Sequence, residues 1–256
     1  MQIYVCVKHV PDSAANIHIV DNLKIDESVP FLLNPYDEHA VTEAAALKNQ
    51  VPGSEIIAVC LGKKDAESTV RSALAMGADR GVLVETEKTC DSMATARALH
   101  AAIVRDGPAD LILTGKESID NEGMQTQFRI GALFDFPVVT NAVSLAIKNG
   151  KATVTCELAG GRTRTFDLTL PCVIGAGRGL NTPIYPTFPD VVKSRKKPIE
   201  TITLSELNVP AAPGSTKIVA MTPLVQKRHP QKITGSPLAQ AAEIIRILRQ
   251  EAKVLS

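Results

Sequence analysis

The chain has 256 residues, a formal net charge of +1 and an aromatic content of 4%. The near-neutral charge gives no electrostatic basis for binding nucleic acid, and so few aromatic side chains argue against base-stacking platforms. The apolar runs are too short to cross a membrane. The length predicts one domain of about 200 residues with an appendage.

Strand-like and helix-like segments alternate in the first half of the chain. Strands are predicted at 3–8, 56–61, 80–85 and 111–114, and helices at 37–48, 65–76, 92–105 and 124–134. This alternation predicts an α/β fold, with a parallel sheet covered by helices on both faces. Three further strands at 138–147, 151–158 and 163–170, joined at Asn149-Gly150 and Gly160-Gly161, predict an antiparallel hairpin extension, and a buried strand follows at 172–176.

The last part of the chain has a different composition. Prolines accumulate after Asn181, which argues against a regular sheet or a long helix there. We therefore expect an α/β domain at 1–180 and a proline-rich C-terminal arm at 181–256. A final helix at 238–255 carries an apolar stripe, which packs either on its own domain or on another chain.

Cysteines and histidines give no sign of a metal site or a disulfide framework. The five residues of each type lack ligand spacing, and two of the cysteines lie in apolar strands, where we expect reduced, buried thiols. The chain enters a strand directly after Met1, without a signal or transit segment. We expect a cytoplasmic protein, although a mitochondrial matrix protein without its leader would look the same.

The segment from Gly115 to Thr126 is the most informative motif. It follows a predicted buried strand and precedes a helix, so that Gly115 lets the backbone approach a ligand and the helix offers N–H groups to an anion. Side chains suited to ribose and phosphate follow at Ser118, Asp120, Asn121, Gln125 and Thr126. Taken alone, the segment is equally consistent with an ordinary polar crossover loop and a helix cap.

Two more loops of this kind follow predicted strands. Asn34 is a good N-cap for the next helix, and Pro35 fits its first position. Gly62 follows the strand at 56–61 and begins the third loop, which leads into the helix at 65–76. Because the carboxyl ends of parallel strands share one edge of a sheet, the three loops can surround one ligand.

The order and spacing of several motifs resemble the beta subunit of an electron transfer flavoprotein, nearly from end to end. The motifs are Cys6-Val7-Lys8, Asn34-Pro35-Tyr36-Asp37, the run from Ala73 to Arg80, Gly115-Lys116 with Ile119-Asp120 and Gln125-Thr126, Leu170-Pro171, and Leu180-Asn181 with Pro183, Tyr185, Pro189 and Lys193. The resemblance implies an adenine-nucleotide α-hydrolase-like fold.

The resemblance also implies two cofactors. FAD is held mainly by the alpha subunit of such a heterodimer, whereas the beta subunit buries a structural AMP and covers one side of the flavin. The residues implied for cofactor binding are Cys6, Asn34, Pro35, Tyr36, Asp37, Leu61, Gly115, Lys116, Ser118, Asp120, Asn121, Gln125 and Thr126, with Cys60 as a weaker neighbour. Tyr36 takes the place of an aromatic side chain that approaches the flavin ring, and Ser13 stands where a second one is common.

An electron carrier that is not itself an enzyme is therefore expected. The sequence has no Gly-x-Gly-x-x-Gly fingerprint, Walker loop or nucleophile elbow, and no histidine lies near Ser118 and Asp120 to act as a base. The implied partners are the alpha subunit, acyl-CoA dehydrogenases and a membrane quinone oxidoreductase. Phe188, Pro189 and Lys193 lie where the family carries its recognition loop, with Phe188 in place of a leucine-like side chain. The family's C-terminal arm reaches onto the alpha subunit.

Two alternatives stay open. In bifurcating flavoproteins the beta subunit helps to bind a second FAD and NADH, and the loop commonly continues Ile-Asp-Gly-Asp-Thr-Ala-Gln-Val-Gly-Pro. Here Asn121-Glu122 is bulkier and more acidic, while Gln125-Thr126 resembles the AMP branch. The other alternative is a standalone adenine-nucleotide-binding module of the universal-stress type, which would lack the proline-rich arm.

Overall fold

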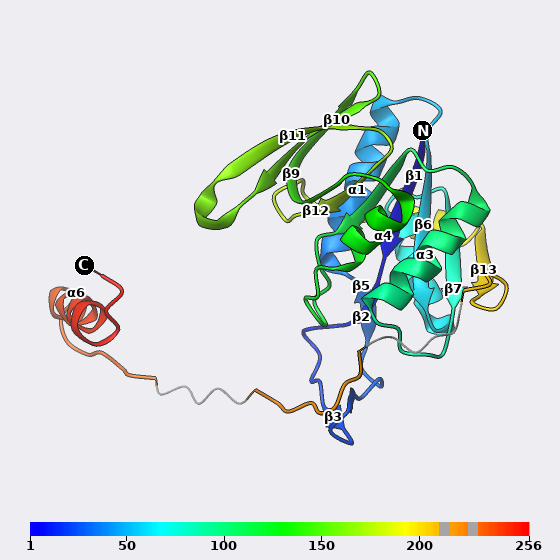
Figure 1. The fold of residues 1–256 in the computed structure, drawn as a ribbon. Coiled ribbons are helices and arrows are strands. Elements are labelled where there is room, and N and C mark those ends of the chain that lie inside the picture. The colour runs from blue at the N-terminus through cyan, green and yellow to red at the C-terminus, as the bar shows by residue number, and fades with distance from the viewer. Residues whose placement is uncertain (210–215, 225–229, 256) are drawn as a thin grey trace. The chain divides into compact units, whose positions relative to one another are not determined.

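A nine-stranded sheet forms the centre of the first part of the chain (Figure 1). The computed structural model describes residues 1–209, 216–224 and 230–255. The strand order is β11-β10-β9-β12-β8-β1-β6-β7-β13. The strands are β1 (Gln2–Val7), β6 (Glu55–Gly62), β7 (Arg80–Glu85), β8 (Leu111–Gly115), β9 (Val138–Lys148), β10 (Lys151–Glu157), β11 (Thr163–Thr169), β12 (Cys172–Ala176) and β13 (Ile199–Thr203).

The predicted fold class is confirmed. β9, β12, β8, β1, β6, β7 and β13 pair in parallel, whereas β10 pairs antiparallel with β9 and β11 and forms the predicted hairpin extension. The helices are α1 (Pro35–Gln50), α2 (Glu67–Ala75) after a 3-10 turn (Lys64–Ala66), α3 (Ser92–Asp106) and α4 (Thr126–Phe134). Small ribbons pair β2 (His9–Pro11) with β5 (Phe31–Leu33) and β3 (Ile19–Val20) with β4 (Lys24–Ile25), and a 3-10 turn η2 (Ala159–Gly161) joins β10 to β11.

Alternating side chains of the strands face two separate hydrophobic cores. In β1, Ile3 and Val5 face the core that α1 and α2 complete, whereas Tyr4 and Cys6 face the core that α3 and α4 complete. Both sets are buried, because strands of a parallel sheet have helices on each face. The central strands therefore read as continuous apolar runs in the sequence.

The amino ends of the strands are joined by a network of charged side chains. Arg80 donates to Asp106 at 2.8 and 2.7 Å and to Glu55 at 2.9 Å, and the hydroxyl of Tyr4 donates to Asp106 at 2.7 Å. Asp79 accepts the backbone N–H of Ile56 at 2.8 Å. The Ala73–Arg80 motif thus stabilises one edge of the sheet. The loops whose side chains suit ribose and phosphate lie at the opposite edge.

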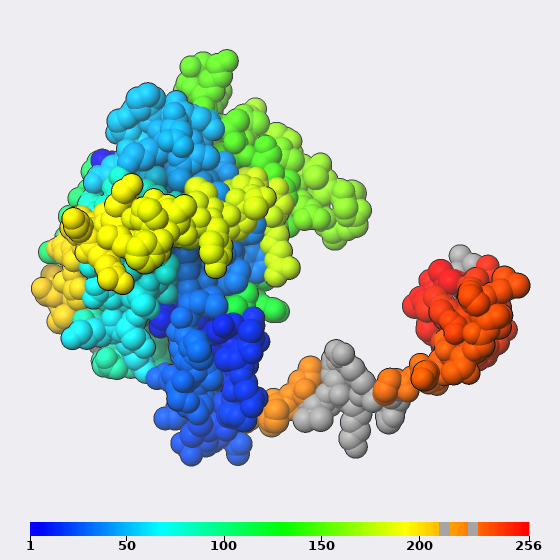
Figure 2. Space-filling view, turned by 180° about the vertical axis from the view of Figure 1, so that it is seen from behind, coloured from blue at the N-terminus to red at the C-terminus, as the bar shows by residue number. Residues whose placement is uncertain are grey.

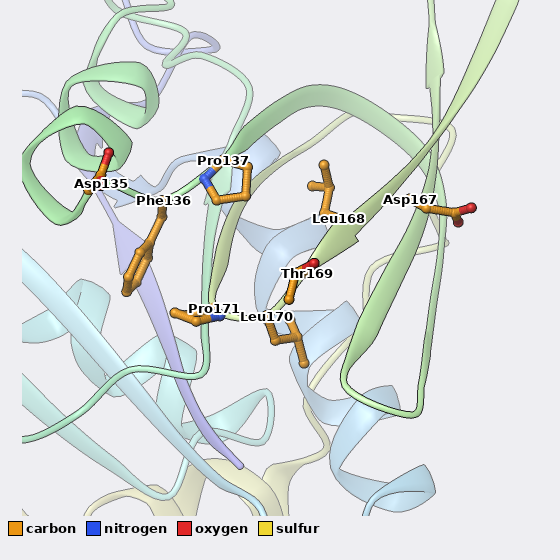
Figure 3. Close-up of a pocket in the computed structure, with 8 residues that line it drawn as sticks. All are labelled: Asp135, Phe136, Pro137, Asp167, Leu168, Thr169, Leu170 and Pro171. Atoms are coloured by element: carbon orange, nitrogen blue, oxygen red, sulfur yellow. The ribbon is translucent and has the colours of Figure 1, made fainter.

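A shallow cavity of about 490 Å³ also lies at this amino edge (Figure 3). Its walls come from the connection between α4 and β9, from the end of β11 and from the connection between β11 and β12. The lining residues are Asp135, Phe136, Pro137, Asp167, Leu168, Thr169, Leu170 and Pro171. None of these residues was predicted to bind a cofactor. The cavity is therefore separate from the candidate site.

The sheet gains a strand from beyond residue 181, contrary to prediction, and a short helix also forms there. Helix α5 (Phe188–Ser194) packs on α2, and β13 joins the sheet beside β7. Pro189 lies in the first turn of α5 and Pro198 precedes β13, so that the prolines border these elements instead of interrupting them. In Figure 2 the segment that contains α5, in yellow, crosses the surface over α1 and α2.

The chain forms two compact units, Met1–Ala220 and Met221–Ser256. The predicted domain division after residue 180 stays a prediction. Within the second unit, α6 (Pro237–Arg246) is followed by a π-helical turn, η3 (Ile247–Glu251). The helical part thus ends at Glu251, so the prediction of a helix as far as residue 255 is wrong. Large apolar side chains of this unit, including Leu238 and Ile245, are exposed.

Candidate functional site

The candidate site lies at the carboxyl edge of the sheet, where loops follow β1, β6, β8 and β12. β8 lies between β1 and β12, and the backbone N–H of Lys116 donates to the carbonyl of Ala176 at 3.0 Å. The loops after β8 and β12 therefore begin side by side. The loop after β12 was not among the three predicted strand-end loops, and a ligand shared by those three stays a prediction.

Asp37 joins the ends of two strands to the start of α1. Its carboxylate accepts the backbone N–H of Lys8 at 2.7 Å and that of Gly115 at 2.9 Å. The side chain is buried, and desolvation raises the pKa of Asp37 to about 7 although these N–H groups favour the charged form. Both oxygens already have protein partners, so Asp37 positions the loops.

Asn34 has a different role from the one predicted. It is the N-cap residue of α1, but its side chain makes no capping hydrogen bond. Its amide group instead donates to the carbonyl of Glu117 at 2.9 Å and accepts the N–H of Ile119 at 3.2 Å. The prediction of a side-chain cap is wrong, because a partner more than 80 positions away in the sequence takes the amide.

Gly115 is required for packing inside the protein. A Cβ atom at this position would lie 2.4 Å from Oδ1 of Asp37 and 2.6 Å from Cβ of Tyr36. The close approach is therefore between β8 and α1. A larger residue at position 115 would displace α1 whether or not a ligand binds, so such a variant tests packing before it tests ligand binding.

Lys8 holds the loop after β8 through an ion pair. Its Nζ atom donates to the two oxygens of Asp120 at 2.7 and 2.6 Å and to Ser118 at 3.2 Å. The hydroxyl of Ser118 also donates to Oδ1 of Asn121 at 2.9 Å, and the same oxygen accepts the N–H of Gly123 at 3.1 Å. Three predicted site residues, Ser118, Asp120 and Asn121, are thus brought together.

The second half of the loop contacts α3. Oε1 of Gln125 accepts from Ser92 at 3.2 Å and from Arg129 at 2.6 Å. Gln127, which the sequence analysis did not single out, is buried and donates to the carbonyl of Lys116 at 2.8 Å. Thr126 begins α4, and its hydroxyl has no hydrogen-bond partner among the residues that the structure describes.

Tyr36 lies beside two cationic side chains. Nζ of Lys116 is 5.1 Å from the centroid of its ring, and the guanidinium carbon of Arg178 is 5.3 Å from it. The tyrosine is buried, so these cations and α1 fix the orientation of the ring. Lys116 also forms an ion pair with Glu117 at 3.1 Å.

The remaining predicted cofactor residues are core residues close to the strand ends. Cys6 and Cys60 are buried in the two different cores, and Leu61 packs partly buried against the core that contains Cys6. Burial raises the pKa of both thiols, that of Cys60 to about 12, so that neither is a thiolate at neutral pH. Pro35 is the first residue of α1, as predicted.

The predicted partner-binding residues lie on α5. Phe188 is 81% exposed, and a reciprocal capping box of Thr187 and Asp190 fixes the start of the helix. Arg71 of α2 donates to the carbonyls of Ser194 and Lys197 at 3.0 and 2.7 Å. A fixed support therefore presents Phe188, Pro189 and Lys193 to the solvent.

Within residues 1–209, 216–224 and 230–255, no helix is long and apolar enough to span a bilayer. These residues also contain no group of three or more His, Cys, Asp or Glu side chains placed to hold a metal ion.

Lys8, Ser92, Gln127 and Arg178 are the contributors to this edge that sequence reasoning missed. Lys8 and Arg178 each follow a buried strand by one or two positions, as Lys116 does. Their position directly after a buried strand could therefore have marked both as candidates. Nothing comparable marks Gln127, a buried polar residue inside a short helix.

Comparison with known proteins gives similarity along the whole chain. The family model described as electron transfer flavoprotein domain matches residues 22–207. The electron transfer flavoprotein subunit beta of Syntrophomonas wolfei is 34% identical over 254 residues, covering 99% of this chain and 98% of the relative. The subunit of the same name from Bacillus subtilis is 33% identical, covering 100% of both chains. That from Sus scrofa is 32% identical, covering 98% of this chain and 97% of the relative.

The role of Asn34 can be tested with two substitutions. Asn34→Ala removes both contacts with the loop and should lower the free energy of unfolding by about 1–3 kcal/mol, because Glu117 and Ile119 lose their partners. Asn34→Asp keeps only the acceptor and should lose an intermediate amount, measured by urea denaturation. Asp caps helices as well as Asn does. Full stability of Asn34→Asp would therefore contradict the loop contact and support a cap.

The raised pKa of Asp37 predicts a pH dependence of stability. The folded chain binds a proton at Asp37 more tightly than the unfolded chain does, so the contribution of this residue should fall as the pH rises from about 4 to about 7. Wild-type stability relative to Asp37→Asn, measured by denaturation across this range, should fall accordingly and then level off. If the stability difference between wild type and Asp37→Asn did not change with pH, the pKa of Asp37 would not be raised in the folded chain.

Proposed function

The chain belongs to the electron transfer flavoprotein family as one of its beta subunits, and we propose that it is the AMP-binding half of a heterodimer whose alpha subunit carries FAD. The heterodimer would act as an electron carrier and not as an enzyme in its own right. When bound, FAD would supply the redox chemistry. This chain would supply the nucleotide cradle, one wall of the flavin site and a docking surface.

The built loop after β8 is the observation that carries the AMP proposal. Asn34, Asp37 and Gln127 hold its backbone through hydrogen bonds, and Lys8 holds the side chain of Asp120. A loop held in this way needs little further ordering on binding, which lowers the entropic cost. The hydroxyl of Thr126, the amide of Gln125 and backbone N–H groups at the start of α4 have the chemistry that ribose and phosphate require.

The same contacts divide the proposed AMP residues into two groups. Asn34, Asp37 and Gly115 would act by holding the backbone, since Asn34 and Asp37 bind backbone groups and Gly115 leaves no room for a larger residue. Ser118, Asp120, Asn121, Gln125 and Thr126 would face the nucleotide, with Lys8 available to exchange Asp120 for a phosphate oxygen. Cys6, Cys60, Leu61 and Pro35 would supply apolar contact.

Tyr36 is proposed to lie against the flavin of the alpha subunit. A buried aromatic ring excludes water from one side of such a cofactor and adds stacking. Lys116 and Arg178 hold it from within this chain. Ser13 stands where the family commonly has a second aromatic side chain near the flavin. Tyr36 would therefore be the aromatic contact of this chain with the flavin ring.

The bifurcating alternative is disfavoured by the loop around Gly123. Glu122 and Met124 have positive φ angles of 47° and 50°, a conformation in which side chains larger than glycine are strained. Asn121 is held by Ser118 and Gly123. The side chains of Asn121 and Glu122 would crowd a second pyrophosphate that needs close backbone approach, and Glu122 would add negative charge beside it.

Electron donors are proposed to dock on α5. Phe188 offers a large apolar side chain, and Lys193, Arg195 and Lys196 follow it on the same segment. The ammonium of Lys197 donates to the carbonyls of Leu74 and Ala78, so it belongs to the support. An acyl-CoA dehydrogenase would dock here, and a membrane quinone oxidoreductase would accept the electrons. The exposed apolar side chains of α6 would pack on the alpha subunit.

AMP binding can be tested at Thr126. Because the hydroxyl of Thr126 has no partner among the described residues, Thr126→Val should leave stability unchanged and remove one ligand contact. We expect AMP retention by the heterodimer to weaken about tenfold, the equivalent of about 1.4 kcal/mol. The matched control is Thr163→Val, at an exposed threonine of β11. Equal AMP retention in both variants would refute a contact at Thr126.

Docking can be tested at Phe188. Phe188→Ala should slow electron transfer from the native dehydrogenase severely, because an aromatic anchor contributes at least about 2 kcal/mol, whereas Phe188→Leu should retain most of the rate. FAD content, AMP content and reduction by dithionite should stay the same. Val104→Ala, at an exposed apolar residue of α3, is the control. Wild-type transfer by Phe188→Ala would make Phe188 an ordinary surface residue.

A further inference from the structure

The loop after β12 presents Arg178 on a fixed support. The N–H of Gly177 donates to the carbonyl of Ala142 at 2.9 Å, and the N–H of Leu180 donates to Gly177 at 3.2 Å and closes a turn. Asn181 then anchors the chain to α1, where it donates to the carbonyl of His39 at 3.1 Å. Arg178 lies at the centre of this turn, so its position is set by β9 and α1.

The guanidinium of Arg178 carries an uncompensated charge. Its contact within the described part of the chain is the ring of Tyr36, at 5.3 Å, and no acidic side chain there pairs with it. Lys116 lies at a similar distance from the same ring, but Glu117 neutralises it at 3.1 Å. Of the two cations beside Tyr36, Arg178 is therefore the one with net electrostatic influence on a neighbouring group.

We propose that Arg178 sets the reduction potential of the flavin through the ring of Tyr36. The inference rests on the proposed function, in which Tyr36 lies against the flavin. Reduction adds negative charge to the flavin, and a positive charge one aromatic ring away stabilises the reduced form relative to the oxidised one. Arg178 is thus a tuning residue that acts without taking part in electron or proton transfer.

The chain provides a matched control for this experiment. Arg164 of β11 is also an exposed arginine over an aromatic ring, with its guanidinium carbon 6.0 Å from the centroid of Phe166. It lies on the hairpin extension and not at the carboxyl edge of the parallel strands. Removal of its charge should change the net charge of the protein by the same amount, without acting on Tyr36.

The experiment measures the flavin midpoint potential of the purified heterodimer by spectroelectrochemistry. Arg178→Gln should lower the potential, whereas Arg178→Lys, which keeps the charge, and Arg164→Gln should stay near the wild-type value. Because the guanidinium is exposed, the difference between wild type and Arg178→Gln should shrink as the salt concentration rises. FAD content should be equal in all four proteins.

Three other results would contradict the inference or the proposed function on which it rests. A wild-type potential in FAD-loaded Arg178→Gln overturns the inference and leaves the proposed function intact. A potential in Arg178→Lys as low as that in Arg178→Gln overturns the charge explanation, since it would assign the effect to guanidinium geometry. A wild-type heterodimer that purifies without flavin overturns the proposed function, and the inference fails with it.

Discussion

The carboxylate of Asp37 accepts one backbone N–H from the end of β1 and another from the end of β8, and the candidate site depends on this junction. It places the first turn of α1 against both strands, and Gly115 leaves room for it. From there Asn34 reaches the loop after β8, and Tyr36 meets Lys116 and Arg178. The raised pKa of Asp37 indicates that this arrangement is held at a cost in desolvation.

The two edges of the sheet differ in how their polar side chains are used. At the amino edge, Arg80 and Asp106 join strands and a helix in a network whose members satisfy one another. At the carboxyl edge, side chains hold backbone while hydroxyl, amide and guanidinium groups remain available. This difference would explain why motifs as different as Ala73–Arg80 and the loop after Gly115 both belong to the family pattern, since the first maintains the fold and the second is proposed to bind the nucleotide.

Sequence patterns predicted the central strands and helices because burial on both faces leaves long apolar runs, as in β6 and β8. They failed where partners are distant in the chain. Asn34 has the residue type of a helix cap, and only tertiary structure reveals that its amide contacts Glu117. β13 was missed because neighbouring prolines suggested irregular structure, and its pairing with β7 is more than 100 positions away. Arg178 acquires its position from contacts with β9 and α1.

The central claim, that this chain is the AMP-binding beta subunit of an FAD-bearing heterodimer, is tested most directly by native mass spectrometry. The chain would be co-expressed with its alpha subunit, and the ligands released from the intact complex would be identified and counted. The account predicts one FAD and one AMP per heterodimer. Two FAD molecules without AMP would contradict it in favour of the bifurcating alternative, and a stable single chain that binds nucleotide without a partner would contradict the assignment to a heterodimer.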